Sequence, residues 1–305
     1  MSFKKLCFSL LGIGFMMFTS CSEPSIDKEK IQDVWPFGVS YEIFIQSFAD
    51  SDGDGIGDFP GLTSKLDYLQ DLGIQAVWLM PISPSPSYHK YDVTDYYGVH
   101  PDYGTMADFK KFVDQAHARN IRVIIDLVVN HCSSEHPWFV EAVKSSESPY
   151  RDYFVWADPD SIKEHISKKE ITLDSDNITQ WHESDGNADY YYGFFWGGMP
   201  DLNYDNPKVR QEMIKVGQFW LEEMGVDGFR LDAARHVYPD DRPNDSHAWW
   251  MEFGDAMRAI KPDVYMVGEV WGDASEIGPY LQGLTSMFNF ELWRGFNKIL
   301  TAESN

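Results

Sequence analysis

Short apolar runs alternate with amphipathic segments along most of this chain, and the alternation restricts the folds that the chain can adopt. The strand-like runs cover residues 39–44, 76–79, 121–127, 226–231, 264–267 and 286–290. After the first run, leucines recur at helical spacing from Leu62 to Leu72 and end at Gly73. Strands that alternate with helices form parallel sheets. The pattern therefore predicts an α/β fold built on a parallel sheet.

Two further helices are indicated by the residues that would begin and end them. Thr105 can cap a helix that carries Phe109 on its apolar face. Asn206 followed by Pro207 is typical of a helix start, and Gly225 would end that helix.

Regular periodicity is lost over residues 132–203, a segment rich in Trp, Tyr, Ser and Asp. Such a stretch is too long for an ordinary loop in a compact domain. We therefore expect a small inserted domain at this point of the chain.

Two carboxylates follow strand-like runs directly. Asp232 ends the motif Gly-Phe-Arg-Leu-Asp, and Glu269 lies in Gly-Glu-Val-Trp. Arg230 precedes Asp232 by two residues, so on a strand both side chains face the same way, and the guanidinium favours the ionised carboxylate. A structural Arg–Asp pair in a core is the alternative. On a (β/α)8 barrel, such a carboxylate pair, roughly 5–5.5 Å apart, is what a retaining glycoside hydrolase needs.

Three further motifs precede this pair in order along the chain. They are Tyr-Asp-Val-Thr-Asp-Tyr at 91–96, Asp-Leu-Val-Val-Asn-His at 126–131 and Met-Pro-Asp-Leu-Asn at 199–203. Together with the two carboxylate motifs, the series resembles the alpha-amylase family of glycoside hydrolases over residues 36–300. The resemblance implies a (β/α)8 TIM barrel.

This barrel would be divided along the chain. We expect its first part at residues 36–131, the small inserted domain at 132–203 after strand three, and the barrel continued at 204–305. About six of the eight strands of a barrel are found. The family's Asn-His-Asp motif, which supplies a third catalytic carboxylate, is not found. We expect a fragment of a longer gene product or a natural truncation, and a 305-residue chain that by itself is poorly soluble and close to inactive.

The resemblance also implies roles for single residues. Asp232 would be the nucleophile, and Glu269 the general acid and base. The residues that would contact the sugars are Tyr91, Asp92, His131, Arg230, Arg235, His236 and Trp271. For Trp271, stacking on a sugar and simple packing both stay open. Two positions depart from the family pattern, because Lys90 stands where Gly is usual and Arg235 where Lys is commoner.

An acidic run after the first strand has the composition of a cation site. Carboxylates alternate with small residues there, and hard cations such as Ca²⁺ take six to eight oxygen ligands. The run resembles the calcium loop of bacterial members of the family, which implies Ca²⁺ bound by Asp50, Asp52, Asp54, Asp58 and the backbone carbonyl of Ile56. A solvated acidic turn is the alternative. Asn130 is a candidate ligand for a second calcium ion.

The N-terminus has the features of an export signal. Lys4 and Lys5 precede an apolar stretch at residues 6–18, too short to span a bilayer, and Cys21 follows. The pattern resembles a bacterial lipoprotein signal over residues 1–20, with a polar tether at 21–35. We expect an exported protein anchored to a membrane through lipidated Cys21; an ordinary cleaved signal is the alternative. Cys132 would then be the one other thiol, so an intramolecular disulfide framework is excluded.

The formal net charge of −23 argues against nucleic acid as a partner, because phosphate contacts need Lys and Arg. A neutral alpha-glucan suits it. The leading interpretation is retaining hydrolysis of alpha-1,4-glucosidic bonds in starch-like glucans and maltooligosaccharides, favoured by Met199 at the head of its motif. Two alternatives remain: an oligo-alpha-1,6-glucosidase or transglycosylase, and a non-catalytic glucan-binding lipoprotein or inactive fragment.

Overall fold

The computed structural model describes residues 35–36, 38–165, 179–184 and 189–302. They belong to a compact unit that spans residues 35–305. The expected signal peptide at 1–20, Cys21 and all of the tether except Trp35 lie outside the described residues. Within the described ranges, no helix combines the length and the apolar character needed to cross a membrane.

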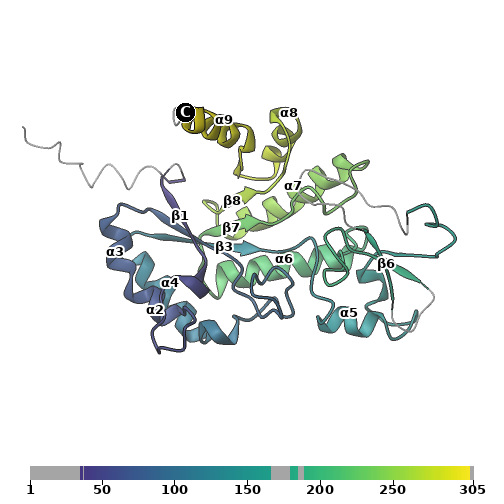
Figure 1. Ribbon diagram of the computed structural model, residues 1–305, viewed down its shortest axis with the longest axis horizontal. Coiled ribbons are helices and arrows are strands. Elements are labelled where there is room, and N and C mark those ends of the chain that lie inside the picture. Colours follow the sequence, from purple (N-terminus) through teal and green to yellow (C-terminus); the bar gives the residue numbers. More distant parts are fainter. Residues whose placement is uncertain (1–34, 37, 166–178, 185–188, 303–305) are drawn as a thin grey trace, which may run out of the picture. The chain divides into compact units, whose positions relative to one another are not determined.

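A parallel sheet forms the frame of this unit (Figure 1). Its strands, in both chain order and spatial order, are β1 (Ser40–Ile43), β2 (Ala76–Leu79), β3 (Arg122–Leu127), β7 (Gly228–Leu231), β8 (Tyr265–Gly268) and β9 (Ser286–Met287). Every neighbouring pair is parallel. Successive parallel strands joined by helices are the arrangement of a (β/α)8 barrel, so the expected fold class is confirmed for the strands described.

One or more helices follow each strand of this sheet along the chain. They are α2 (Phe59–Ser64), α3 (Leu66–Asp71), α4 (Met106–His117), α6 (Pro207–Glu222), α7 (Pro243–Ile260), the short α8 (Ala274–Ile277) and α9 (Phe290–Ala302). Thr105 caps α4 in a reciprocal capping box with Asp108, and Asn206 caps α6. Gly73 and Gly225, which follow α3 and α6, have φ values of 83° and 77°, in the region that favours glycine.

Two expected elements differ in the structure. The leucine-rich helix is divided at Lys65 into α2 and α3, and Leu72, expected on the buried face, is 52% exposed because it lies at the C-terminal cap of α3. The last strand is also shorter than expected. Asn289 accepts a hydrogen bond from the backbone N–H of Leu292, so the chain turns into α9 at Phe290 instead of continuing as a strand.

The two faces of the sheet differ in chemistry. Alternate strand residues that face the helices are apolar and buried, as Leu79, Ile125 and Phe229 are. The residues between them face the barrel interior, and there Asp126 lies opposite Arg230 in the register of β3 and β7. A strand places successive side chains on opposite faces. The charged interior face is therefore fixed by the same alternation that builds the core.

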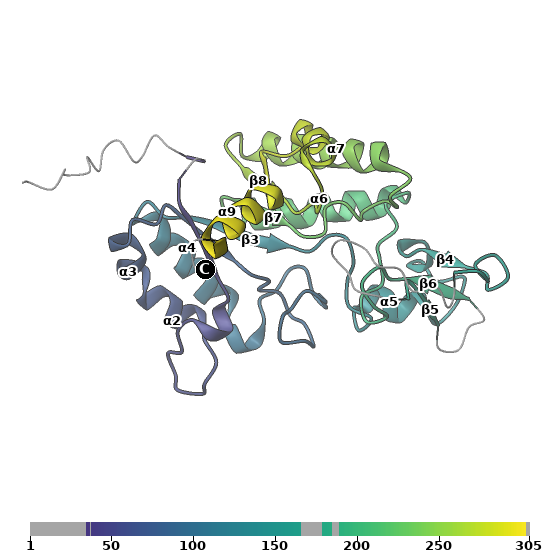
Figure 2. The ribbon, with the colours of Figure 1, turned by 45° about the horizontal axis from the view of Figure 1, so that its top comes forward.

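The segment expected as an inserted domain contains a second, antiparallel sheet (Figure 2). Its strands are β4 (Trp156–Ala157), β6 (Tyr190–Tyr192) and β5 (Trp181–Glu183), in that spatial order, and α5 (Pro137–Ala142) precedes them. Isolated bridges from His131 to Asp201 and from Phe154 to Leu202 hold the ends of the segment together. The insertion therefore starts and ends beside the carboxyl end of β3.

Candidate active site

Arg230 lies at the centre of a cluster of carboxylates. Its Nη1 donates to both oxygens of Asp126, at 2.9 and 3.1 Å, and to Oδ1 of Asp232 at 2.5 Å. Its Nη2 lies 2.8 Å from Oε2 of Glu269. One guanidinium therefore holds three carboxylates that come from three different strands.

The strand ends explain why these groups meet. Asp126 is the residue before the last of β3, Asp232 directly follows β7, and Glu269 directly follows β8. The carboxyl ends of parallel strands lie at the same edge of the sheet, where barrel enzymes carry their active sites. Asp232 and Glu269 are far apart in the sequence, and the pairing of β7 with β8 brings them close together.

Burial and charge act on this cluster in opposite directions. Burial raises the pKa of Asp126 and of Glu269, and the positive charge of Arg230 opposes the rise in both. Burial works against the charge of Arg230, but Asp126 and Asp232 raise its pKa well above the ordinary value. The site therefore keeps its cation charged while it favours protonation of Glu269 more than solution does.

Tyr91 closes one side of the cluster. Its hydroxyl donates to Oδ2 of Asp126 at 3.1 Å, and its ring lies 5.6 Å from the guanidinium carbon of Arg230. Burial and the nearby Asp126 raise the pKa of Tyr91 far above its ordinary value, so the hydroxyl stays protonated. The neighbouring Asp92 turns the other way and accepts hydrogen bonds from the hydroxyls of Ser85 and Ser87. Asp92 thus supports the loop, and Tyr91 faces the cavity.

Lys90 occupies the position before Tyr91, where the family pattern has glycine. Its φ is 64°, in the left-handed region, and only 2% of the residue is exposed. The ammonium lies 5.0 Å from the centre of the Tyr103 ring. Burial lowers the pKa of Lys90, and Asp102 and Asp92 oppose this. Lys90 therefore adopts a backbone conformation that is easier for glycine, and its side chain is buried behind the loop.

His131 lines the cavity from the end of the motif at residues 126–131. Burial lowers its pKa to about 4, so the imidazole is neutral near pH 7. Its Nε2 is buried and has no partner among the described residues. The adjacent Asn130 is fully buried as well, and its Oδ1 also lacks a partner there. Buried polar atoms are nearly always hydrogen-bonded, so these two atoms indicate positions for a ligand or water.

A cavity of about 420 Å³ opens over the cluster. Its lining is aromatic and charged, and consists of His89, Tyr91, His131, Phe195, Trp196, Met199, Arg230, Asp232, Glu269 and Trp271. This is the size and character expected of a small-molecule site, with apolar walls and a few convergent polar groups. Four of the seven residues expected to contact the sugars (Tyr91, His131, Arg230 and Trp271) therefore share one cavity with Asp232 and Glu269.

Besides Asp92, two expected sugar-binding residues, Arg235 and His236, do not line the cavity. Arg235 donates to Asp240 at 2.9 Å and to the carbonyl oxygen of Trp271 at 3.0 Å, and it lines a separate hollow. His236 stacks on Phe194, with 3.8 Å between ring centres. Arg235 thus holds the chain after Glu269 instead of facing the cavity.

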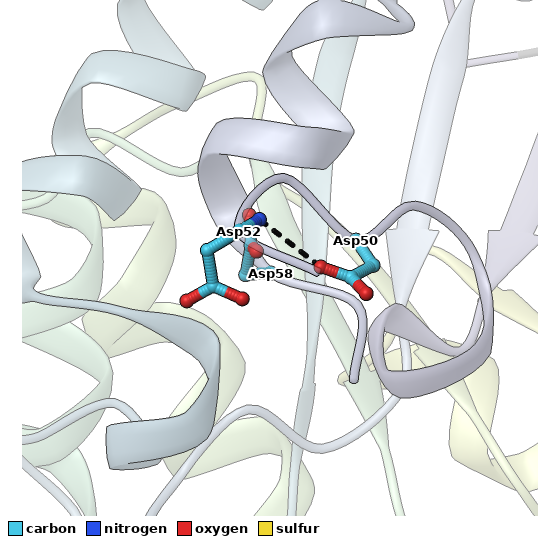
Figure 3. A group of neighbouring side chains, drawn as sticks. All are labelled: Asp50, Asp52 and Asp58. Carbon is cyan, nitrogen blue, oxygen red and sulfur yellow. Dashed lines mark hydrogen bonds between the residues drawn. The ribbon is translucent and has the colours of Figure 1, made fainter. Parts of the chain in front are cut away.

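The acidic run after β1 forms a tight loop (Figure 3). Oxygen atoms of Asp50, Asp52 and Asp58 lie within 4.8 Å of one another. Asp54 lies outside this group and accepts from the backbone N–H of Ile56 at 2.7 Å. Backbone hydrogen bonds from Gly53 and Gly55 lower the pKa of Asp50. The loop therefore gathers three carboxylates, the donor set that a hard cation prefers.

Comparison with known proteins identifies the family to which this fold belongs. A model of the alpha-amylase catalytic domain matches residues 42–299. The chain belongs to the alpha-amylase family. It is 52% identical to alpha-amylase 3 of Dictyoglomus thermophilum over 267 residues, which are 88% of this chain and 49% of that protein. It is 39% identical to the glucan 1,6-alpha-glucosidase of Streptococcus pneumoniae, over 84% of this chain and 48% of the relative.

Solved structures agree with this family. The crystal structure of the alpha-amylase from H. orenii superposes with a TM-score of 0.77 and 51% sequence identity, over 84% of this chain and 52% of that one. The chain thus spans about half the length of the alpha-amylase family relatives it matches.

Several residues of this alpha-amylase family site carry no clear signal in the sequence. Phe195 and Trp196 line the cavity from the segment without periodicity, and His89 does so from the loop before Tyr91. Asp201 lies inside a recognised motif, yet its burial is visible only in the fold. It accepts from the backbone N–H of Phe194, and burial raises its pKa to about 8. The aromatic content of residues 189–199 is the one pattern that could have indicated the cavity wall.

Proposed function

We propose that the protein is a retaining hydrolase of alpha-1,4-glucosidic bonds in starch-like glucans and maltooligosaccharides. The observation that carries the proposal is the presence of Asp232 and Glu269 on one guanidinium at the floor of one cavity. Two carboxyl groups that flank the glycosidic bond are the minimum for double displacement.

The reaction divides between these two carboxyl groups. A carboxylate oxygen of Asp232 attacks the anomeric carbon while Glu269 gives its proton to the glycosidic oxygen, so the leaving chain departs with a free hydroxyl. Glu269, now ionised, then takes a proton from water, which attacks the anomeric carbon and releases Asp232. The pKa of Glu269, raised by burial, suits the first step, because the group must be protonated before cleavage.

The cavity wall suits a sugar ring. Tyr91 offers a ring face beside the carboxylates, and the unpartnered Nε2 of the neutral His131 can bond a sugar hydroxyl. An acidic protein binds a neutral polymer without electrostatic cost, and the net charge is −23.

The test uses the protein as the cell produces it. Proton NMR of maltoheptaose hydrolysis should show the alpha anomer first, and Asp232→Ala should stop turnover while glucan binding persists. A beta anomer appearing first would refute the double displacement. Binding without turnover in the parent protein would favour the non-catalytic glucan-binding alternative.

A second candidate is an oligo-alpha-1,6-glucosidase or transglycosylase. It is supported by relatives with such names, among them the oligo-1,6-glucosidase of Parageobacillus thermoglucosidasius at 37% identity. Parallel assays on maltoheptaose and isomaltose separate the two. Faster cleavage of isomaltose would replace the alpha-1,4 assignment and leave the roles of Asp232 and Glu269 unchanged.

Calcium binding is the proposed role of the acidic loop. The oxygens of Asp50, Asp52 and Asp58 would hold the ion, with the backbone of Ile56 and the carboxylate of Asp54 as further candidates. A second ion at Asn130 is a weaker candidate. The unpartnered Oδ1 of Asn130 supports it, as does the nearby carboxyl of Asp201. In either place the ion would contribute structure, not a chemical step.

Export and lipid anchoring through Cys21 complete the proposal, supported by Lys4, Lys5 and the apolar stretch at residues 6–18. Metabolic labelling with tritiated palmitate should mark the parent protein and not Cys21→Ser. Label on both proteins, or on neither, would reject the anchor.

A further inference from the structure

The carboxyl group of Glu269 is held through both of its oxygens, and the two oxygens have different partners. Oε2 lies 2.8 Å from Nη2 of Arg230 and accepts from the backbone N–H of Ala233 at 3.3 Å. Oε1 accepts a hydrogen bond from the indole Nε1 of Trp271, also at 3.3 Å. A donor on each oxygen leaves the carboxyl group one orientation.

The indole ring of Trp271 is itself held in place. It stacks on Phe290, with 3.8 Å between ring centres and 8° between ring planes. The guanidinium carbon of Arg294 lies 6.0 Å from the ring centre. Both neighbours belong to α9, so a separate element fixes the ring plane and with it the direction of the N–H group. The stack also takes one face of the indole, which weakens the interpretation of Trp271 as a platform for a sugar.

We propose that Trp271 is a positioning residue for Glu269, whose indole N–H holds Oε1 so that the acid presents its proton to the leaving oxygen in one orientation. The inference rests on the proposed function, because it takes Glu269 as the general acid.

The bond has a consequence for the acidity of Glu269. A donor that bonds a carboxylate favours its ionised form, so the bond lowers a pKa that burial raises. Trp271→Phe keeps the stacked ring and removes the N–H. The pKa of Glu269 should therefore rise, whereas a substitution that only disturbs packing has no reason to move it in this direction.

The experiment titrates Glu269 directly. The chain is labelled with ¹³C at its glutamate carboxyl carbons, and Glu269→Gln identifies the resonance by its loss. Trp271→Phe should raise the titration midpoint by about 0.5–1 pH unit, the size expected for one hydrogen bond of ordinary net strength. Trp196→Phe is the matched control, because it alters an indole that lines the same cavity and does not bond Glu269.

Each outcome of the titration either supports or overturns the positioning role of Trp271. A midpoint that Trp271→Phe moves no more than Trp196→Phe does overturns the proposal. If thermal melting shows that Trp271→Phe does not fold, Phe290→Leu takes its place. That variant keeps the N–H but loosens the ring, and should raise the midpoint by a smaller amount; no rise overturns the proposal.

The titration also separates this inference from the proposed function. The titration requires no turnover. A shifted midpoint in a protein that hydrolyses no glucan would therefore refute the proposed function, whereas the hydrogen bond from Trp271 to Glu269 would still be supported. In an active protein, the alkaline limb of the kcat/KM profile should move upward together with the midpoint. A shifted midpoint with an unmoved alkaline limb would overturn the positioning role while hydrolysis itself stands.

Discussion

Nη1 of Arg230 donates to both oxygens of Asp126, and both side chains are almost fully buried. Asp126 on β3 and Arg230 on β7 are direct neighbours in the register of the two parallel strands. Since Asp126 also accepts from Tyr91, it fixes the guanidinium whose other contacts go to Asp232 and Glu269. The position of the two carboxylates proposed to react therefore depends on a third carboxylate, that of Asp126.

Replacing Arg230 by Met should lower the free energy of unfolding by about 3–5 kcal/mol near pH 7, the cost of leaving buried charges without a partner. The loss should shrink as the pH falls, because protonated carboxyl groups no longer need the cation. Burial already raises the pKa of Glu269 and Asp126, so the recovery should begin above the ordinary carboxyl range of about 4. Urea unfolding of the parent and of Arg230→Met at several pH values measures how the loss in unfolding free energy changes with pH.

The control for this prediction is Arg119→Met. Arg119 pairs with Asp67, whose side chain is 80% exposed, so its loss should cost less than about 1 kcal/mol at every pH. Equal costs for the two variants would mean that Arg230 contributes no more than a surface ion pair.

Asp227 holds the opposite end of the barrel. It is fully buried and lies 2.6 Å from His117, 3.0 Å from Arg122 and 3.2 Å from Lys261. Burial alone would raise its pKa, but the bond from His117 and the further donors lower it to about 2. The depressed value stabilises the fold above the ordinary carboxyl pKa of about 4, and this contribution is lost as pH falls through about 2.

Asp227→Asn should therefore cost roughly 2–3 kcal/mol at pH 7, and the difference from the parent should vanish between about pH 4 and pH 2. Denaturant midpoints across this range measure it. Asp255→Asn, at a side chain that is 80% exposed, is the matched control and should show little change. A constant penalty for Asp227→Asn down to pH 2 would mean that the charge of Asp227 is not what stabilises the fold.

The sequence predicts the parts of this structure that depend on local periodicity. The residues 76–79 of β2, the cap of α4 at Thr105 and the start of α6 after Asn206 agree with expectation, because alternation and capping act within a few residues. The division at Lys65 and the start of α9 at Phe290 do not, since they depend on backbone geometry at one position.

The same limit applies to the site. Asp232 and Glu269 could be found because each follows a strand, and the sheet then brings them together. The orientation of Arg235 towards Asp240 and Trp271, and the bond from Trp271 to Glu269, could not be found, because they join side chains that no spacing relates. Tertiary contacts alone determine the orientation of Arg235 and the bond from Trp271 to Glu269.

Lys90 offers a test of a strained loop. Lys90→Gly removes a left-handed lysine, worth roughly 1–2 kcal/mol, but it also exposes the space that the buried stem fills, worth about 0.8 kcal/mol for each methylene group. We expect a net loss of about 1–2 kcal/mol on that balance. Lys90→Met keeps the stem and should lose less. Thermal melting of both variants decides it; a more stable Lys90→Gly would show that strain outweighs packing.

Removing calcium should lower the melting temperature, because an ion that binds only the folded chain stabilises it by mass action. Asp50→Asn combined with Asp52→Asn should abolish most of this response, since their oxygens lie within 4.8 Å of one another and of Asp58. Asp71→Asn, an exposed carboxylate at the end of α3, is the control and should respond to chelator as the parent does. Calorimetric melts with excess calcium and with EGTA give the comparison. A double variant as sensitive to EGTA as the parent would place the stabilising ion elsewhere, and the pair Asn130 and Asp201 would then be tested by Asn130→Leu.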